Sequence, residues 1–168
     1  MKTLGLIFAL TFIAGAINAQ GLDPKTLKLF NPPPDSWPTY NGDYSGRRFS
    51  ELKQINASNI DLLKIEWMYR IKGVGPQRGV GDPVIKSTPL LVNGVLYFTI
   101  PDHIFAVNAR TGEHIWQYDF QDQGGHLVGQ RGVGMYKDWL YFESPDGWFI
   151  SLNAKDGKER WRKKIADE

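Results

Sequence analysis

Residues 106–116 read AVNARTGEHIW, and residues 151–161, which begin 45 positions later, read SLNAKDGKERW. Each stretch places an Asn after a short apolar run, then a turn that closes on Gly112 or Gly157, and then a Trp four residues further on. Asn, and the Thr-Gly and Asp-Gly pairs, suit tight turns. Each stretch therefore predicts a β-hairpin whose second strand ends at Trp116 or Trp161, and the shared spacing indicates a repeated unit.

The repeat extends in the N-terminal direction. Leu96-Tyr97-Phe98 is matched 44 positions later by Leu140-Tyr141-Phe142, and residues 101–102 and 145–146 are both Pro-Asp. Asn93-Gly94, between two apolar runs, is a strong signal for a two-residue hairpin turn. About four short strands in each repeat of some 45 residues is the period of a β-propeller blade. The alternative is a coincidental pair of similar hairpins.

The predicted fold class is therefore all-β: a partial β-propeller of about two four-stranded blades, occupying residues 67–168. Trp67 lies 49 positions before Trp116 and is expected to end the strand that precedes the first repeat. A Trp at these strand ends can lie between neighbouring blades and donate its indole N–H to backbone. Trp67, Trp116, Trp161, Gly112 and Gly157 are accordingly interpreted as structural residues.

Composition limits the function. The chain has 168 residues, no Cys, and 20 Lys and Arg against 18 Asp and Glu, so its net charge is +2. That charge is too small to indicate nucleic acid as a partner. Without Cys there is no disulfide, thiolate-bound zinc or cysteine nucleophile. The three His residues show no spacing typical of metal ligands.

The N-terminus resembles an export signal. Residues 1–19 carry one Lys, then an apolar run, then small residues ending at Ala19. The apolar run is shorter than the roughly 20 residues that span a bilayer, which favours a signal peptide and a periplasmic or secreted protein over a membrane anchor. Residues 20–66 are Pro-rich at first and are predicted to form an extended arm with a short helix over 60–63, capped by Asn56 or Ser58.

At this point the sequence resembles a known family. Residues 106–116 look like the Trp-docking repeat of quinoproteins, the pyrroloquinoline quinone (PQQ)-dependent alcohol dehydrogenases, and Trp37-Pro38-Thr39-Tyr40 and Arg48-Phe49-Ser50-Glu51-Leu52 are similar to the start of that family's mature chain. The resemblance implies an eight-bladed propeller that holds PQQ and calcium near its axis and oxidises alcohols or sugars in the periplasm. The present chain would supply the first two blades, and further blades or another chain would close the ring.

The repeat register points to candidate ligand-binding residues. Residues 86–88 and 130–132 both precede the innermost strand of a blade, so Lys86 and Arg131 are expected at one mouth of the central channel. Converging cations favour an anionic ligand, and Arg suits a carboxylate. Under the resemblance that ligand is PQQ, with Arg131, Lys86, Thr88 and His126 as candidate contacts. Each cation could instead pair with a neighbouring carboxylate, and His126 could be an ordinary solvated loop residue.

Two departures from the family keep a second interpretation open. Lys86 stands where quinoprotein alcohol dehydrogenases usually have a Glu, and residues 125–126, Gly-His, stand where they usually have two adjacent Cys. The family's calcium ligands and catalytic Asp come from later blades, so no catalytic residue is assigned here, and calcium would depend on residues beyond this chain. The alternative function is a non-catalytic propeller of the cell envelope, acting as a scaffold or protein-binding platform.

Overall fold

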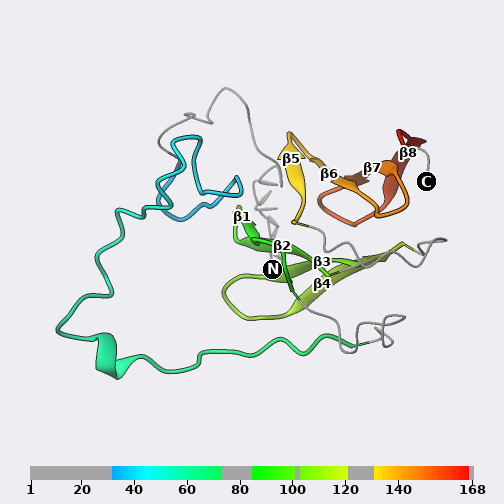
Figure 1. The fold of residues 1–168 in the computed structure, drawn as a ribbon. Helices are drawn as coiled ribbons and strands as arrows, with labels where there is room; N and C mark the ends of the chain where they lie inside the picture. Colours follow the sequence, from blue (N-terminus) through cyan, green and yellow to red (C-terminus); the bar gives the residue numbers. More distant parts are fainter. Residues whose placement is uncertain (1–31, 73–84, 101–102, 121–130, 167–168) are drawn as a thin grey trace, which may run out of the picture.

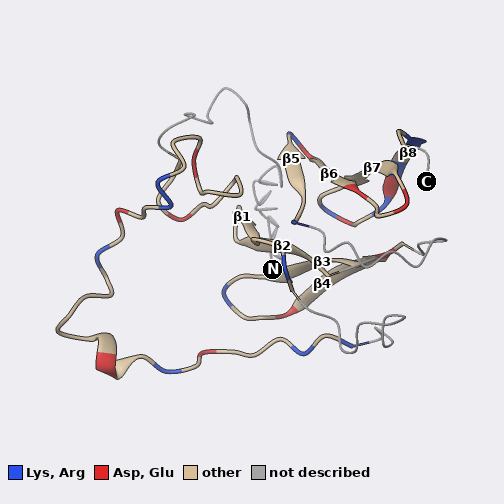
Figure 2. Ribbon diagram, viewed as in Figure 1, with Lys and Arg blue, Asp and Glu red and all other residues tan. Residues whose placement is uncertain are grey.

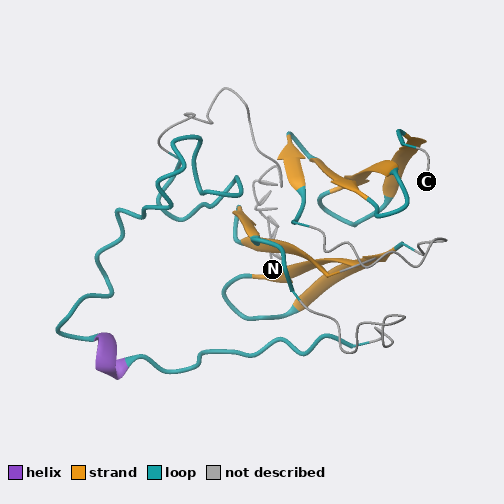
Figure 3. Ribbon diagram, in the orientation of Figure 1, coloured by secondary structure: helices purple, strands orange, loops and turns teal. Residues whose placement is uncertain are grey.

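The structure, a computed structural model, describes residues 32–72, 85–100, 103–120 and 131–166. These residues form two four-stranded antiparallel sheets that lie one against the other, and a long N-terminal segment that runs outside them (Figure 1). Apart from one short helix, the described segments outside the sheets are loops and turns (Figure 3). The predicted signal peptide, residues 1–19, lies outside the described residues.

The first sheet contains β1 (Leu90–Val92), β2 (Val95–Ile100), β3 (His103–Asn108) and β4 (His114–Asp119), paired in that order. Asn93 and Gly94 connect β1 to β2, with φ values of 49° and 77°. Positive φ at both central residues defines the turn that matches the twist of a hairpin. The hairpin predicted from Asn93-Gly94 is therefore confirmed.

The second sheet repeats this plan with β5 (Gly134–Tyr136), β6 (Trp139–Glu143), β7 (Trp148–Asn153) and β8 (Glu159–Lys164). The repetition includes an irregularity of the pairing between the last two strands of each sheet. It falls between Ala106 and Val107 in the first sheet and between Ser151 and Leu152 in the second. Two successive four-stranded units confirm the predicted all-β, partial-propeller architecture, and the described sheets do not close into a ring.

Apolar side chains that alternate along the strands fill the space between the two sheets. Tyr97, Ile104, Leu140, Ile150 and Leu152 are each at most 1% exposed and belong to one continuous cluster. This cluster draws on both sheets, so each sheet is buried on the face that meets the other. A smaller cluster lies on the opposite face of the first sheet, around Phe98 and Phe105.

The prediction that Trp116 and Trp161 end their strands is wrong. Trp116 is the third of six residues in β4, and Trp161 is the third of six in β8. The strands continue because the residues after each Trp still pair with the preceding strand, as Tyr118 does with Ile104. The prediction that Trp67 ends a strand is also wrong within the described residues, because no described segment pairs with residues 64–72.

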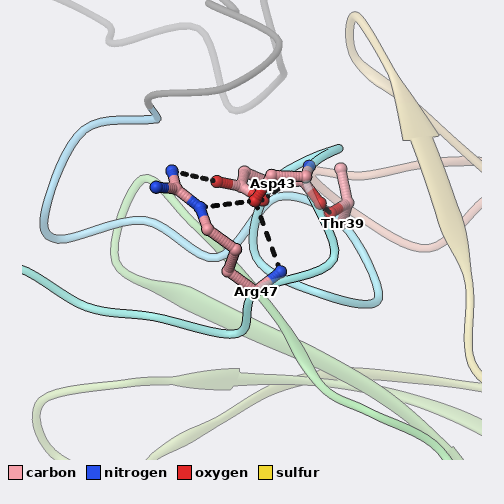
Figure 4. A network of polar contacts seen from close by, with 4 residues as sticks. Thr39, Asp43 and Arg47 are labelled. Atoms are coloured by element: carbon pink, nitrogen blue, oxygen red, sulfur yellow. Dashed lines mark hydrogen bonds and ion pairs between the residues drawn. The ribbon is translucent and has the colours of Figure 1, made fainter.

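The N-terminal arm is attached to the first sheet at its inner edge. Trp37 and Leu91 exchange backbone hydrogen bonds of 2.8 and 3.0 Å, forming an isolated antiparallel bridge beside β1. Further along, Asp43 organises a loop by accepting hydrogen bonds from Ser45 and Arg47, while the Thr39 hydroxyl donates to the Asp43 carbonyl (Figure 4). The arm therefore reaches the innermost strand before it leaves the sheets.

The predicted short helix is present as a 3-10 helix, η1 (Ile60–Leu62). Its N-cap is Asn59, not Asn56 or Ser58, and no side chain caps it. The Asn56 side chain is used differently: its oxygen accepts hydrogen bonds from Ser58. No helix in the described ranges has the length and hydropathy that crossing a bilayer requires.

Candidate functional site

The peptides that precede β1 and β5 lie side by side. The Thr88 amide donates a hydrogen bond of 3.4 Å to the Arg131 carbonyl. Gly132, with φ of 123°, packs so closely on this peptide that a Cβ there would lie 3.2 Å from the Thr88 carbonyl oxygen. The structure thus brings together the two segments that the repeat register aligns, just before the first strand of each sheet.

Ser87 fixes the segment before β1. Its hydroxyl donates to the Thr99 carbonyl at 2.9 Å and accepts from the Thr99 amide at 3.0 Å. Thr99 is fully buried in β2, so these two hydrogen bonds tie the loop to the core of the first sheet. The neighbouring residues Lys86 and Thr88 are thereby held beside Arg131, and these three residues are called the rim. Lys86 is exposed and Thr88 is half-buried.

Two residues of the N-terminal arm join this rim. The Arg48 guanidinium lies over the Tyr40 ring, 5.1 Å from its centroid, and donates from Nε to Asn41 at 2.8 Å. Hydrogen bonds from Arg48 and Thr88 lower the pKa of the Tyr40 hydroxyl, and the positive charge of Arg131 acts in the same direction. Tyr40 and Arg48 were not singled out by the register argument, because they lie outside the repeat.

The rim consequently combines cationic groups with hydroxyl donors. Arg131 and Lys86 are exposed, and Thr88 and Tyr40 lie close to Arg131. Such a set suits a ligand that carries carboxylates, since guanidinium and hydroxyl groups both donate to carboxylate oxygens. His126, the fourth candidate, lies outside the described residues.

Metal ligation finds no support in the part of the chain that the structure describes. No group of three His, Asp or Glu side chains gathers there in a way that could hold an ion. The His103 ring nitrogen contacts Asp119 at 2.7 Å, which is a two-residue pair. No calcium ligand is therefore assigned to the described residues.

The residues interpreted as structural lie at two equivalent interfaces. In the first, the indole of Trp67 donates to the Ala109 carbonyl at 3.2 Å, and its ring covers Gly112 so closely that a Cβ there would lie 2.6 Å from it. In the second, Trp116 donates to the Ala154 carbonyl at 3.0 Å, and its ring covers Gly157 at the same 2.6 Å.

Trp161 occupies the equivalent position at the far side of the second sheet. It is half-buried against the rings of Tyr141 and Phe149, whose centroids lie 6.1 and 5.7 Å away. Four-stranded meanders that stack through a Trp of one unit and a Gly of the next define the chain as part of a β-propeller of the Trp-docked class.

Comparison with known proteins specifies the family. Residues 37–138 match the family model described as "Glucose/ethanol/alcohol dehydrogenase, beta-propeller domain" of the PQQ family. Because this match covers more than half of the chain, the chain belongs to the PQQ-type β-propeller family of dehydrogenases. The resemblance seen in the sequence is thus confirmed.

Similar proteins agree with this assignment. The chain is 37% identical over 132 residues to the quinohemoprotein alcohol dehydrogenase of Comamonas testosteroni. This alignment covers 74% of this chain and 18% of that protein. The crystal structure of that enzyme superposes with a TM-score of 0.71 at 31% identity, covering 87% of this chain and 22% of the other. Quinohemoprotein alcohol dehydrogenase ADHIIG of Pseudomonas putida HK5 gives a TM-score of 0.75 at 29% identity, covering 89% and 22%. The chain thus spans about a fifth of the length of these relatives.

Proposed function

We propose that this chain forms the first two blades of an exported, PQQ-dependent dehydrogenase that oxidises an alcohol or a sugar. Support comes from the family assignment and from the names of its relatives, which are quinohemoprotein or quinone alcohol dehydrogenases. Export to the periplasm or beyond rests on the signal-like residues 1–19. In the proposed protein eight blades close the ring.

The observation that carries the proposal is the contact between the segments before β1 and β5. A backbone hydrogen bond joins Thr88 to Arg131, and the positive charge of Arg131 acts on the Tyr40 hydroxyl, which supports a site that combines a guanidinium with hydroxyl donors. Arg131 would bind a PQQ carboxylate through paired hydrogen bonds, and Thr88 and Lys86 would hold the same anionic edge. His126 is proposed as a further contact.

When bound, PQQ supplies the two-electron acceptor for the alcohol, which no amino-acid side chain provides. The residues of this chain would bind and orient the cofactor and would not be catalytic. A calcium ion, if present, would be held by residues other than those described. One similar structure is titled "Europium-containing methanol dehydrogenase" (TM-score 0.65, 25% identity, 86% of this chain and 25% of that one), so a lanthanide is a second ion to test.

The experiment is thermal unfolding of the whole protein that contains these two blades, with and without PQQ, in the presence of Ca²⁺ or Eu³⁺. A ligand that binds the folded state stabilises it by RT ln(1 + [L]/Kd), so the melting temperature rises with the logarithm of the ligand excess over Kd. Arg131→Ala should reduce that shift, whereas Arg110→Ala, an exposed arginine at the β3–β4 turn, should preserve it. No shift up to millimolar PQQ contradicts cofactor binding.

A second function, a non-catalytic scaffold of the cell envelope, is favoured by Lys86 and by the Gly-His pair at 125–126. These residues replace an acidic side chain and two Cys that the family's dehydrogenases usually place against PQQ. Lys86→Glu separates the two functions. Gain of PQQ-dependent stabilisation in this variant, with none in the parent chain, supports the scaffold; stabilisation of the parent supports the dehydrogenase.

A further inference from the structure

Trp67 and Trp116 each belong to a longer set of contacts, made by alternate residues of the extended segment 67–71 in the first case and of residues 116–120 in the second. Trp67, Tyr69 and Ile71 are half-buried, while residues 66, 68, 70 and 72 between and around them are exposed. Tyr69 and Ile71 pack on the outer cluster of the first sheet, Tyr69 edge-on to Phe98 with centroids 6.1 Å apart. One face of this extended segment is therefore packed against the first sheet.

The same set recurs where the first sheet meets the second. Tyr118 and Phe120 follow Trp116 at the same intervals, and Tyr118 lies edge-on to Phe142 with centroids 5.9 Å apart. Phe142 is the counterpart of Phe98 in the repeat, 44 positions later. The two interfaces thus share the indole hydrogen bond and an edge-on contact between a tyrosine and the equivalent phenylalanine.

They also match in a polar contact that the repeat pattern alone did not reveal. The Tyr69 hydroxyl is hydrogen-bonded to His114 Nδ1 at 2.8 Å, and the Tyr118 hydroxyl donates to Glu159 at 2.7 Å. His114 and Glu159 are equivalent: each lies two residues before the docking Trp of its own unit. The residue two after one docking Trp therefore meets the residue two before the next.

The residues that follow Trp161 differ in charge from those that follow Trp67 and Trp116. Trp161 is followed at the same intervals by Lys163 and Ile165, so a lysine replaces the tyrosine. Lys163 is exposed and Ile165 is 54% exposed. Four of the six residues of β8 are Lys or Arg (Figure 2). Arg162 is already paired with Glu159 at 2.8 Å, toward the first sheet. Lys163 is on the other face of the strand.

The face of the second sheet that carries Trp161 and Lys163 has a second hydrogen-bond donor, the Tyr141 hydroxyl. In the existing interface the Tyr97 hydroxyl donates to the Ala154 carbonyl at 3.1 Å, so that one oxygen accepts from both Tyr97 and Trp116. Tyr141 is the counterpart of Tyr97, and its ring lies 6.1 Å from that of Trp161, as Tyr97 lies 6.0 Å from Trp116. The face formed by Tyr141, Trp161, Lys163 and Ile165 continues the geometry of an established interface.

We propose that this face binds a third four-stranded unit whose outermost strand carries an Asp or Glu two residues before its own docking Trp, and that Lys163 selects that unit by forming an ion pair with the acidic side chain. An acidic group is expected there because a carboxylate offsets the cost of half-burying an ammonium better than a neutral acceptor does. The unit would also present one carbonyl to Tyr141 and Trp161 and a Gly beneath the indole. This inference concerns assembly and is independent of PQQ binding.

The test extends residues 1–165 with a second copy of residues 121–168, which preserves the spacing of the repeat. The Glu159 of the copy then falls opposite Lys163. The Trp161 indole N–H, followed by NMR, should exchange with solvent as slowly as that of Trp116. Exchange as fast as in the parent chain overturns the proposal that this face binds a unit.

Charge selection is tested in the same extended chain. Lys163→Glu and the copy's Glu159→Lys should each lower the melting temperature by roughly 2–4 °C, and the double reversal should restore most of the loss. Lys155→Glu, at the exposed β7–β8 turn, is the control and should leave it unchanged. Single reversals that behave like this control, or a double variant as unstable as the two losses combined, overturn the ion pair.

Discussion

Nε1 of Trp116, in the first sheet, and the carbonyl oxygen of Ala154, in the second, lie 3.0 Å apart. Trp116 is 7% exposed and Ala154 is completely buried, so this hydrogen bond crosses between the units in a region without solvent. The Tyr97 hydroxyl donates to the same carbonyl oxygen at 3.1 Å, and the indole ring of Trp116 also covers Gly157.

Replacing Trp116 by Phe should lower the free energy of unfolding by about 1–3 kcal/mol, since the substitution removes the donor and part of a buried ring. The Ala154 carbonyl retains the Tyr97 hydroxyl, which keeps the cost below that of a wholly unpaired acceptor. Urea unfolding measures the change. Trp161→Phe is the control, and an equal loss there would contradict the role assigned to the interface.

Gly157→Ala should destabilise the protein by more than Gly94→Ala. Both glycines have similar positive φ values, 70° and 77°, so the backbone strain of an alanine is alike at the two sites. A Cβ at Gly157 would lie 2.6 Å from the Trp116 ring, whereas nothing lies within 4 Å of one at Gly94. The difference between the two variants, about 1–3 kcal/mol, isolates ring packing from strain. Equal melting temperatures for the two variants would refute close docking.

The Tyr118–Glu159–Arg162 contact should make stability depend on acid pH. Burial alone would raise the pKa of Glu159, but hydrogen bonds from Arg162 and Tyr118 outweigh it and hold this pKa below the ordinary 4.5. A lowered carboxyl pKa stabilises the folded state above the unfolded value, and that stabilisation is lost as pH falls through the folded value.

Glu159→Gln should therefore be less stable than the parent at neutral pH, by less than about 1 kcal/mol, and should lose less stability between pH 5 and pH 3. Denaturant titrations at several pH values measure both effects. Glu51→Gln, on the N-terminal arm, should keep the acid dependence of the parent chain. A parallel pH profile for Glu159→Gln would count against the contact.

Ser87→Ala should cost about 1–3 kcal/mol, because it leaves the buried amide and carbonyl of Thr99 without their partner. It should also weaken any stabilisation by PQQ, since Ser87 holds the loop that carries Lys86 and Thr88. Thermal unfolding with and without PQQ gives both values. Ser45→Ala, in the exposed arm loop, should change neither the stability nor the response to PQQ.

Much of the fold was predictable because it is repeated. Asn93-Gly94 specified a hairpin, and the matched Gly112 and Gly157 turns specified two like units, because these residues fix local backbone conformation. Strand ends were less predictable, since continuation of β4 beyond Trp116 depends on pairing with β3, a non-local contact. The extended Trp67 segment has the alternation of a strand but no described partner to pair with.

The candidate site was predictable in part for the same reason. The 44-residue spacing of the sequence repeat aligned the residues before β1 with those before β5, and the structure places these two segments in contact. Tyr40 and Arg48 could not be found by register, because they lie in the unrepeated arm and reach the rim through the Trp37–Leu91 bridge. The signal that these residues mattered was the resemblance of Trp37-Pro38-Thr39-Tyr40 and Arg48-Phe49-Ser50-Glu51-Leu52 to the start of the family's mature chain.

The bridge between Trp37 and Leu91 has a consequence for how the protein avoids aggregation. A short innermost strand such as β1 would otherwise offer unpaired amides and carbonyls to any extended peptide that approached. Here the amide and carbonyl of Leu91 are already bound by the chain's own arm. Cleavage of the arm between the bridge and the first sheet would leave this clip held by its two backbone hydrogen bonds and by the Ser36 hydroxyl, which donates to the same Leu91 carbonyl at 3.3 Å, and would weaken the protection of this strand edge.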